Sequence, residues 1–257
     1  MLVVVKPELY ANIRWYWNED FTDIAPSVTS IKDSAHPFEL PEGWAQEDMD
    51  MYALRGTIAH WQAEMFYKTG EWPSMTTHPD YERLVNYTSE VIKKPLVPEA
   101  CNPKGFLEMY PRYQIKEVER AVFYHHPKYP YAGRFDNWGQ DMAVLEENGN
   151  IFVGDFKTAS SYPKEKLDGY FKQILAYAAA LKVELKLDYM PKAVVFPLNP
   201  KNKCGYGTPI ECTEPEKYLE MWKNDLIFFY SQPGIMEAKA RALAKMTEER
   251  KLAAVTK

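Results

Sequence analysis

The stretch NIFVGDFKT, residues 150–158, decides how this sequence is expected to fold. Successive side chains of a strand point to opposite faces, so Asp155 and Lys157 would share one face while Phe156 lies on the other. A carboxylate and an ammonium at the end of an apolar strand are costly to bury unless they are compensated. A metal ion bound by Asp155 would offset that cost, so the stretch predicts a strand that ends in a charged centre.

A second carboxylate precedes this stretch in YAGRFD, residues 131–136. Gly133 would let a backbone or a substrate approach closely, and Asp136 would lie at the end of its strand. If the two strands are neighbours, Asp136 and Asp155 could share one divalent cation. Hard cations such as Mg²⁺ are commonly held by one or two carboxylates with water and phosphate. Short D-x-K patterns also occur as surface ion pairs, so this interpretation depends on the surrounding segments.

The periodicity of apolar residues predicts a mixed β-sheet flanked by helices, an α/β fold. Strands are expected at 113–126, 131–138, 141–149, 150–158, 191–199 and 208–213, with ENGN as a hairpin turn and a strand or hairpin within 1–26. Helices are expected at 27–33, 46–69, 79–93, 164–182, 214–230 and 233–253, with Gly70 ending the second and 95–111 irregular. We expect one domain, 1–257, with a core at about 113–212, an N-terminal helical part at about 26–95 and C-terminal helices at about 214–253.

The composition, 46% hydrophobic and 26% charged residues, is that of an ordinary globular protein. The net charge of −5 does not by itself favour nucleic-acid binding, although a basic groove can be local. Three scattered cysteines, Cys101, Cys204 and Cys212, predict neither a disulfide framework nor an iron–sulfur cluster. No basic leader and no membrane-spanning apolar run occur, so a soluble, intracellular protein without membrane association is expected. The absence of a Gly-rich phosphate loop and of a nucleophile elbow disfavours a small-molecule α/β enzyme.

The order of three motifs resembles a known family. GRFD and GDFKT are followed by QILAY, residues 173–177, in the helix expected after the charged strand. This arrangement resembles the RecB-like branch of the PD-(D/E)XK nucleases, which carries a G-x-x-D strand, a D-x-K strand and a helix with Q-x-x-x-Y. Gln173 and Tyr177 match the last motif, and their spacing places both on one helix face, beside the apolar stripe. The resemblance implies a restriction-endonuclease-like core in which this helix face approaches the active site.

An upstream helix extends the resemblance. RGTIAHWQAE, residues 55–64, resembles the family's G-T-x-x-H helix, and His60 matches the histidine that reaches the metal site. Gly56 lies one turn before His60 and would leave room for close packing. Glu64 lies one turn after His60 and could orient the imidazole.

Two further segments match less sharply. APSVTSI resembles the P-S-V-T segment of phage-type exonucleases and of the mitochondrial genome maintenance exonuclease, with Ser27 and Thr29 as the matching residues. The same residues could equally cap a helix that follows Pro26. The family also carries an acid on the strand before G-x-x-D. Glu119 is our candidate for it, and Glu117, which has the same strand parity, is the alternative.

The resemblance implies a Mg²⁺- or Mn²⁺-dependent deoxyribonuclease without an iron–sulfur cluster. The metal ligands would be His60, Asp136, Asp155 and the Phe156 carbonyl. Lys157 would position or activate the attacking water. Glu119 would be a further acid of the site, Gln173 and Tyr177 would orient Lys157 or contact the DNA backbone, and Ser27 and Thr29 would contact nucleic acid.

The same resemblance favours an exonuclease that acts on DNA ends or single strands in replication, recombination or repair. Its partner would be DNA, together with a replication or recombination protein. The alternative is a catalytically silent module of the same fold that binds nucleic acid or protein. The complete pair of acids with D-x-K argues against that alternative, because a decayed nuclease has no reason to keep buried unlike charges.

Overall fold

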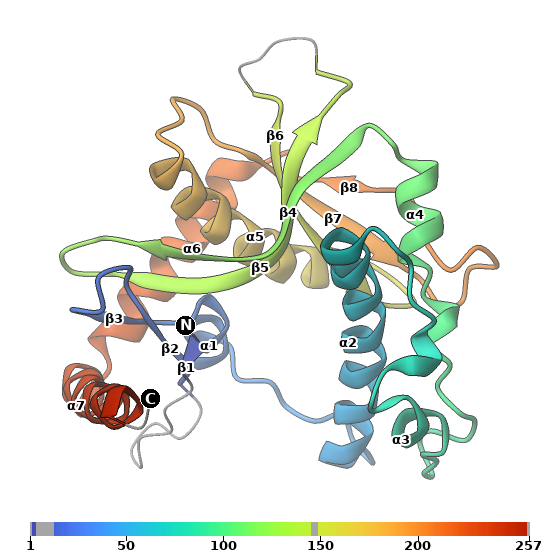
Figure 1. The fold of residues 1–257 in the computed structure, drawn as a ribbon, viewed down its shortest axis with the longest axis horizontal. Coiled ribbons are helices and arrows are strands. Elements are labelled where there is room, and N and C mark those ends of the chain that lie inside the picture. The colour runs from blue at the N-terminus through green and yellow to red at the C-terminus, as the bar shows by residue number, and fades with distance from the viewer. Residues whose placement is uncertain (1, 4–12, 145–148, 256–257) are drawn as a thin grey trace.

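The computed structural model describes the backbone of residues 2–3, 13–144 and 149–255, and the side chains of residues 13–144 and 149–251 (Figure 1). Its strands are β1 (Leu2–Val3), β2 (Trp15–Trp17), β3 (Ile24–Pro26), β4 (Tyr113–Tyr124), β5 (Tyr131–Asp141), β6 (Ile151–Thr158), β7 (Lys192–Leu198) and β8 (Ile210–Glu211). Its helices are α1 (Val28–Ala35), α2 (Gln46–Thr69), α3 (Tyr81–Val85), α4 (Pro103–Met109), α5 (Lys164–Glu184), α6 (Pro215–Ser231) and α7 (Ile235–Val255), with 3₁₀ turns η1 (Met75–Thr77) and η2 (Pro98–Ala100).

The central sheet is mixed, as predicted. Within the described residues it has five strands in the order β4-β5-β6-β7-β8. Strands β4, β5 and β6 pair antiparallel, β6 pairs parallel with β7, and β8 returns antiparallel. The parallel pair is connected through α5, because a parallel neighbour can be reached only by a crossover. A small antiparallel sheet, β1-β2-β3, lies at the N-terminus (Figure 1).

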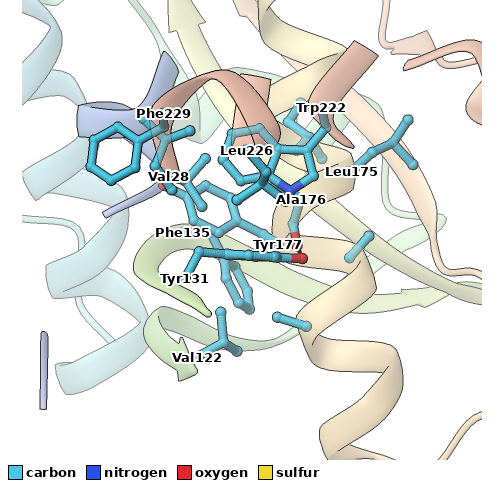
Figure 2. Packing of buried hydrophobic residues seen from close by; sticks show 14 of the residues in the cluster. Val28, Val122, Tyr131, Phe135, Leu175, Ala176, Tyr177, Trp222, Leu226 and Phe229 are labelled. Carbon is cyan, nitrogen blue, oxygen red and sulfur yellow. Dashed lines mark hydrogen bonds between the residues drawn. The ribbon is translucent and has the colours of Figure 1, made fainter. Parts of the chain in front are cut away.

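Strand β6 separates two apolar layers. Val153 packs into a core built with α5, α6 and α1, in which Phe135 of β5 and Tyr177 of α5 also lie (Figure 2). Phe152 and Phe156 pack into a second core with α2 and α4. The alternation predicted for NIFVGDFKT is therefore confirmed, and helices cover both faces of the sheet.

Several helices begin and end as the sequence predicts. Helix α2 spans Gln46–Thr69 and ends at Gly70, whose φ of 79° is the left-handed conformation that glycine adopts without strain. Helix α5 begins at Lys164, and α6 and α7 occupy the two expected C-terminal segments. The N-terminal hairpin and the short helix after Pro26 are also present.

Two predictions between α2 and β4 are wrong. The helix expected at 79–93 is only α3, Tyr81–Val85. The Ser89 hydroxyl accepts the amides of Val91 and Ile92, and such side-chain bonds compete with helix continuation. The stretch 95–111 is not wholly irregular, since it contains η2 and α4. Pro103 occupies the first turn of α4 and Asn102 caps it, so this proline begins a helix.

The strand expected at 141–149 is also wrong in its described part. Strand β5 continues to Asp141, and residues 142–144 form a turn and loop. Asp141 is buried and holds this turn: its carboxylate accepts the Ala143 amide and lies 2.9 Å from Nζ of Lys192. Residues 145–148, with the first half of the ENGN turn, lie outside the described residues.

Candidate active site

The two acid-bearing strands are neighbours, and their pairing stops where the acids lie. The final antiparallel pair between β5 and β6 joins Asn137 to Gly154. Asp136 and Asp155 are the next residues on each strand, at the point where the strands separate. The Phe156 amide donates to Oδ2 of Asp136 at 2.8 Å, in place of a bond to a β5 carbonyl. The backbone of β6 therefore holds Asp136 beside Asp155.

Lys157 is a fixed cation of this site. Its Nζ lies 2.5 Å from Oδ2 of Asp155 and 5.1 Å from the centre of the Tyr170 ring on α5. Burial opposes the charged ammonium, but the carboxylates of Asp155 and Asp136 outweigh burial and raise the pKa of Lys157. At neutral pH the side chain is therefore protonated, and it neutralises one of the two acids.

His60 reaches the site from α2. Its Nδ1 lies 3.2 Å from Oδ2 of Asp136. The approach of α2 depends on Gly56, because a Cβ there would lie 2.8 Å from Oγ1 of Thr158 at the end of β6. The close packing predicted at Gly56 is therefore present. Burial lowers the pKa of His60, but the charge and hydrogen bond of Asp136 outweigh burial, and the net shift is upward.

The two carboxylates titrate as a pair. Burial raises the pKa of Asp155 to about 7. The Lys157 ammonium opposes this increase, and the charge of Asp136 adds to it. Burial also disfavours the charged form of Asp136, but His60 and Lys157 hold the pKa of Asp136 well below its usual range. The site thus carries one firm carboxylate and one that holds its proton more readily than an ordinary aspartate. A divalent cation would favour the ionised form of both.

The structure brings Glu119, rather than Glu117, to the site. Glu119 lines a cavity of 330 Å³ together with Asp136, and its Oε2 lies 2.7 Å from Nε of Arg134. Burial and the charge of Asp136, opposed by Arg134, raise the pKa of Glu119. Its φ of 53° is left-handed, which is rare for a strand residue and typical of functional sites. Glu117 is 49% exposed and instead pairs with Arg120 at 2.5 Å.

Tyr177 is part of the apolar core, so its expected place beside the apolar stripe is wrong. Its side chain is buried, and its ring centre lies 5.7 Å from that of Phe135 (Figure 2). A Cβ at Gly133 would lie 2.7 Å from Cε1 of Tyr177, so this glycine admits the tyrosine ring. Gln173 is half-buried and hydrogen-bonds the Tyr177 side chain, while burial raises the pKa of Tyr177. Their roles toward Lys157 or DNA stay predictions.

Ser27 serves as a helix cap. Its Oγ accepts the Ser30 amide of α1 at 2.9 Å, and its side chain is buried. Ser27 also bridges Ala132 of β5, which fixes the start of α1 against the sheet. A direct contact of Ser27 with nucleic acid is therefore not supported. Thr29 is half-buried, and its expected contact with nucleic acid stays a prediction.

Sequence reasoning missed two residues of the site and misassigned a third. Arg134 pairs with Glu119, and Tyr170 lies beneath the Lys157 ammonium. Both carry a periodic signal: Arg134 shares strand parity with the acid two residues later, and Tyr170 lies one turn before the Q-x-x-x-Y motif. The His60 imidazole is oriented by Asp136 of β5. Glu64, which the sequence suggested for that role, instead pairs with Lys68.

The donor set fits a hard divalent cation. In the described part of the chain, no three His, Cys, Asp or Glu side chains already surround a common point as a metal cage. Mg²⁺ does not require such a cage, since it commonly binds one or two carboxylates and keeps several waters. Asp136 and Asp155 supply those carboxylates, and their contacts with His60 and Lys157 are the ones that a cation would rearrange.

Comparison with known proteins finds distant structural likeness only. No model of a protein family matches the chain, and no curated protein matches it. A candidate exonuclease from Eubacterium rectale has a TM-score of 0.46 at 11% identity, with 84% of this chain and 73% of that chain covered. The protein SSO0001 has a TM-score of 0.30 at 16% identity, with 45% of this chain covered, and the chain spans about half (50%) of its length. Among the helices described, none combines the length and apolarity needed to cross a membrane.

Proposed function

We propose that this chain is a Mg²⁺- or Mn²⁺-dependent deoxyribonuclease that hydrolyses phosphodiester bonds. The observation that carries the proposal is the meeting of Asp136, Asp155 and Lys157 where β5 and β6 separate. A buried acid pair beside a fixed ammonium contributes little to stability, because desolvation offsets the attraction. Such clusters of perturbed groups are typical of functional sites, and here the charges suit a cation and a phosphate.

Each side chain has a distinct part in the proposed reaction. Asp136 and Asp155 would hold the cation, with His60 and the Phe156 carbonyl as further ligands. The cation, when bound, would polarise the phosphate and lower the pKa of a water molecule. Lys157 would hold the attacking water and offset charge that develops on the phosphate. Because the pKa of Lys157 is raised, its part is to position water and stabilise charge while it remains protonated.

The resemblance to RecB-like and phage-type exonucleases favours action on DNA ends or single strands, in replication, recombination or repair. Glu119 would act as the additional acid on the α2 side of the centre. Gln173 would connect the buried Tyr177 to Lys157 or to the DNA backbone. A replication or recombination protein would be the macromolecular partner.

The direct test is incubation of the purified protein with end-labelled single- and double-stranded DNA in Mg²⁺, Mn²⁺ or EDTA. We expect metal-dependent degradation that falls by about 100-fold or more in Lys157→Ala, the scale seen when one charge-stabilising donor is removed. The matched control is Lys223→Ala, which removes an exposed lysine of α6 that pairs with Glu220. Circular dichroism would show that both variants are folded.

The outcomes separate the rival functions. Cleavage that needs metal and Lys157, but not Lys223, would support the nuclease. Equal cleavage by wild type and Lys157→Ala would overturn the assigned site. A folded wild type that cleaves no DNA in either metal would overturn the enzyme and favour the silent binding module.

A further inference from the structure

A second, larger cavity begins beside Lys157. It has a volume of 920 Å³ and is lined by Thr158, which follows Lys157 on β6, and by Tyr170, whose ring lies beneath the Lys157 ammonium. Helix α2 forms another wall, through Tyr52 and Arg55. The cavity therefore lies next to the candidate active site, with Tyr170 between the cavity and Lys157.

Arg55 gives this cavity an unmet charge. Its side chain is only 9% exposed, and its Nε has no hydrogen-bond partner. Over the described residues, its guanidinium has no acidic partner and lies 5.3 Å from the centre of the Tyr52 ring. A buried cation is costly unless it is paired, so an anion in the cavity would relieve a real energetic cost.

The remaining walls combine aliphatic residues and prolines with aromatic rings and basic side chains. The rings of Trp44 and Tyr52 lie 5.3 Å apart, tilted by 30°, and Phe38 at the rim is 65% exposed. Lys166 and Lys201, both exposed, also line the cavity. Among its described lining residues none is Asp or Glu, although the whole chain carries a net charge of −5. Aromatic rings with cations between them are the combination that binds single-stranded nucleic acid.

We propose that this cavity binds the unpaired strand of DNA next to the bond to be cleaved. Arg55 binds a backbone phosphate, Trp44 and Tyr52 stack on a base, and Lys166 and Lys201 hold the strand as it leaves. A base can stack on these rings only when its faces are not covered by neighbouring base pairs. The assignment of the occupant as DNA rests on the proposed nuclease function, and it specifies single strands as the preferred substrate.

The test measures binding separately from cleavage. Fluorescence anisotropy in EDTA compares a short labelled oligothymidylate with a blunt duplex of equal length. We expect at least tenfold tighter binding of the single strand, and about tenfold weaker single-strand binding in Trp44→Ala and in Arg55→Met, the scale of one lost stacking or phosphate contact. Arg55→Met should also reduce the salt slope of binding by about 0.7, the value for one neutralised phosphate of a single strand.

Matched variants protect this test against misfolding. Trp72→Ala removes a half-buried tryptophan that stacks on Phe66 outside the cavity, and Lys223→Ala removes an exposed lysine of α6. Both should bind as wild type does. Lys201→Ala, at the exposed rim, tests the cavity even if Arg55→Met does not fold.

The results distinguish this inference from the nuclease proposal. If Trp44→Ala and Lys201→Ala bind and cleave single strands as wild type does, the cavity assignment is overturned, even where Lys157→Ala abolishes cleavage. Tighter binding of the duplex by wild type would also overturn it. If the cavity variants lose binding but no protein cleaves DNA, the single-strand site stands and the nuclease proposal fails.

Discussion

The cavity of 330 Å³ beside His60 and the cavity of 920 Å³ beyond Thr158 adjoin one candidate centre but differ in charge. The smaller cavity is lined by three acids, Glu64, Glu119 and Asp136, alongside two arginines and two histidines, whereas the larger one is lined by aromatic and aliphatic side chains and three basic ones, with no acid among its described lining residues. An acidic wall attracts a divalent cation, and a basic aromatic wall attracts phosphate and bases. The overall charge of the chain conceals this division, so net charge is a poor guide to whether such a protein binds DNA.

The largest expected effect separates metal chemistry on the acidic side from strand binding on the aromatic side. Asp155→Asn should reduce metal-dependent cleavage by about 1000-fold or more, because it removes a carboxylate beside the metal while keeping the shape of the side chain. Binding of single strands in EDTA should stay within about twofold of wild type, since the aromatic cavity is intact. Asp33→Asn, at an exposed acid of α1, is the control. An equal loss of binding and cleavage would show that the two cavities do not act separately.

The next effect tests the acidic wall alone. Glu119→Gln should slow cleavage by about 10- to 100-fold, the range for a group that assists proton transfer or orientation. Glu117→Gln should leave the rate unchanged, because Glu117 is exposed and pairs with Arg120 away from the cavity. The rates of both variants in Mg²⁺ provide the measurement. If Glu117→Gln is the slower enzyme, the choice between the two acids is wrong.

Much of this centre could be predicted from local sequence patterns. Alternation in NIFVGDFKT places Asp155 and Lys157 together whatever the rest of the chain does, and Gly70 ends α2 within its own turn. A strand ending in unlike charges is itself a signal, because such charges are buried only for a reason.

Other features depend on contacts that local patterns cannot show. Tyr177 is buried because Gly133, on another element, leaves a space that its ring fills. Glu117 and Glu119 have the same strand parity, and only the left-handed backbone at Glu119 and its contact with Arg134 distinguish them. Arg55 is visible in RGTIAH, but whether an arginine has an acidic partner is decided by the tertiary fold.

A packing effect of intermediate size tests the wall that supports the centre. Gly133→Ala should lower the free energy of unfolding by about 1–3 kcal/mol, because its methyl group would meet the Tyr177 ring at 2.7 Å in a filled core. Gly169→Ala, in α5 with open space around it, should instead raise stability by about 0.5–1 kcal/mol. Urea unfolding monitored by circular dichroism measures both. Equal stability changes in the two variants would contradict the close packing of Gly133 against Tyr177.

The last prediction is a pH dependence of stability that arises from the titratable groups of the candidate centre. Without metal, folding raises the pKa of Asp155 from an ordinary value to about 7, so between about pH 4 and 7 the folded state binds more protons than the unfolded state. Stability should therefore fall as pH rises through this window. His60, whose pKa is also raised, adds a loss above its ordinary value, whereas Asp136 acts with the opposite sign below about pH 4.

Thermal unfolding in EDTA at a series of pH values measures this dependence. The expected result is a melting temperature that falls steadily as pH rises through this window. Asp155→Asn should remove the largest part of the decline below about pH 6 and leave the parts due to Glu119 and His60, whose pKa values are also raised. Mg²⁺ should flatten the wild-type profile at high pH, because a cation favours the ionised form of the acids. Trp44→Ala, at the aromatic wall, should keep the wild-type dependence of melting temperature on pH. A changed dependence in this variant would mean that the two cavities are electrostatically coupled.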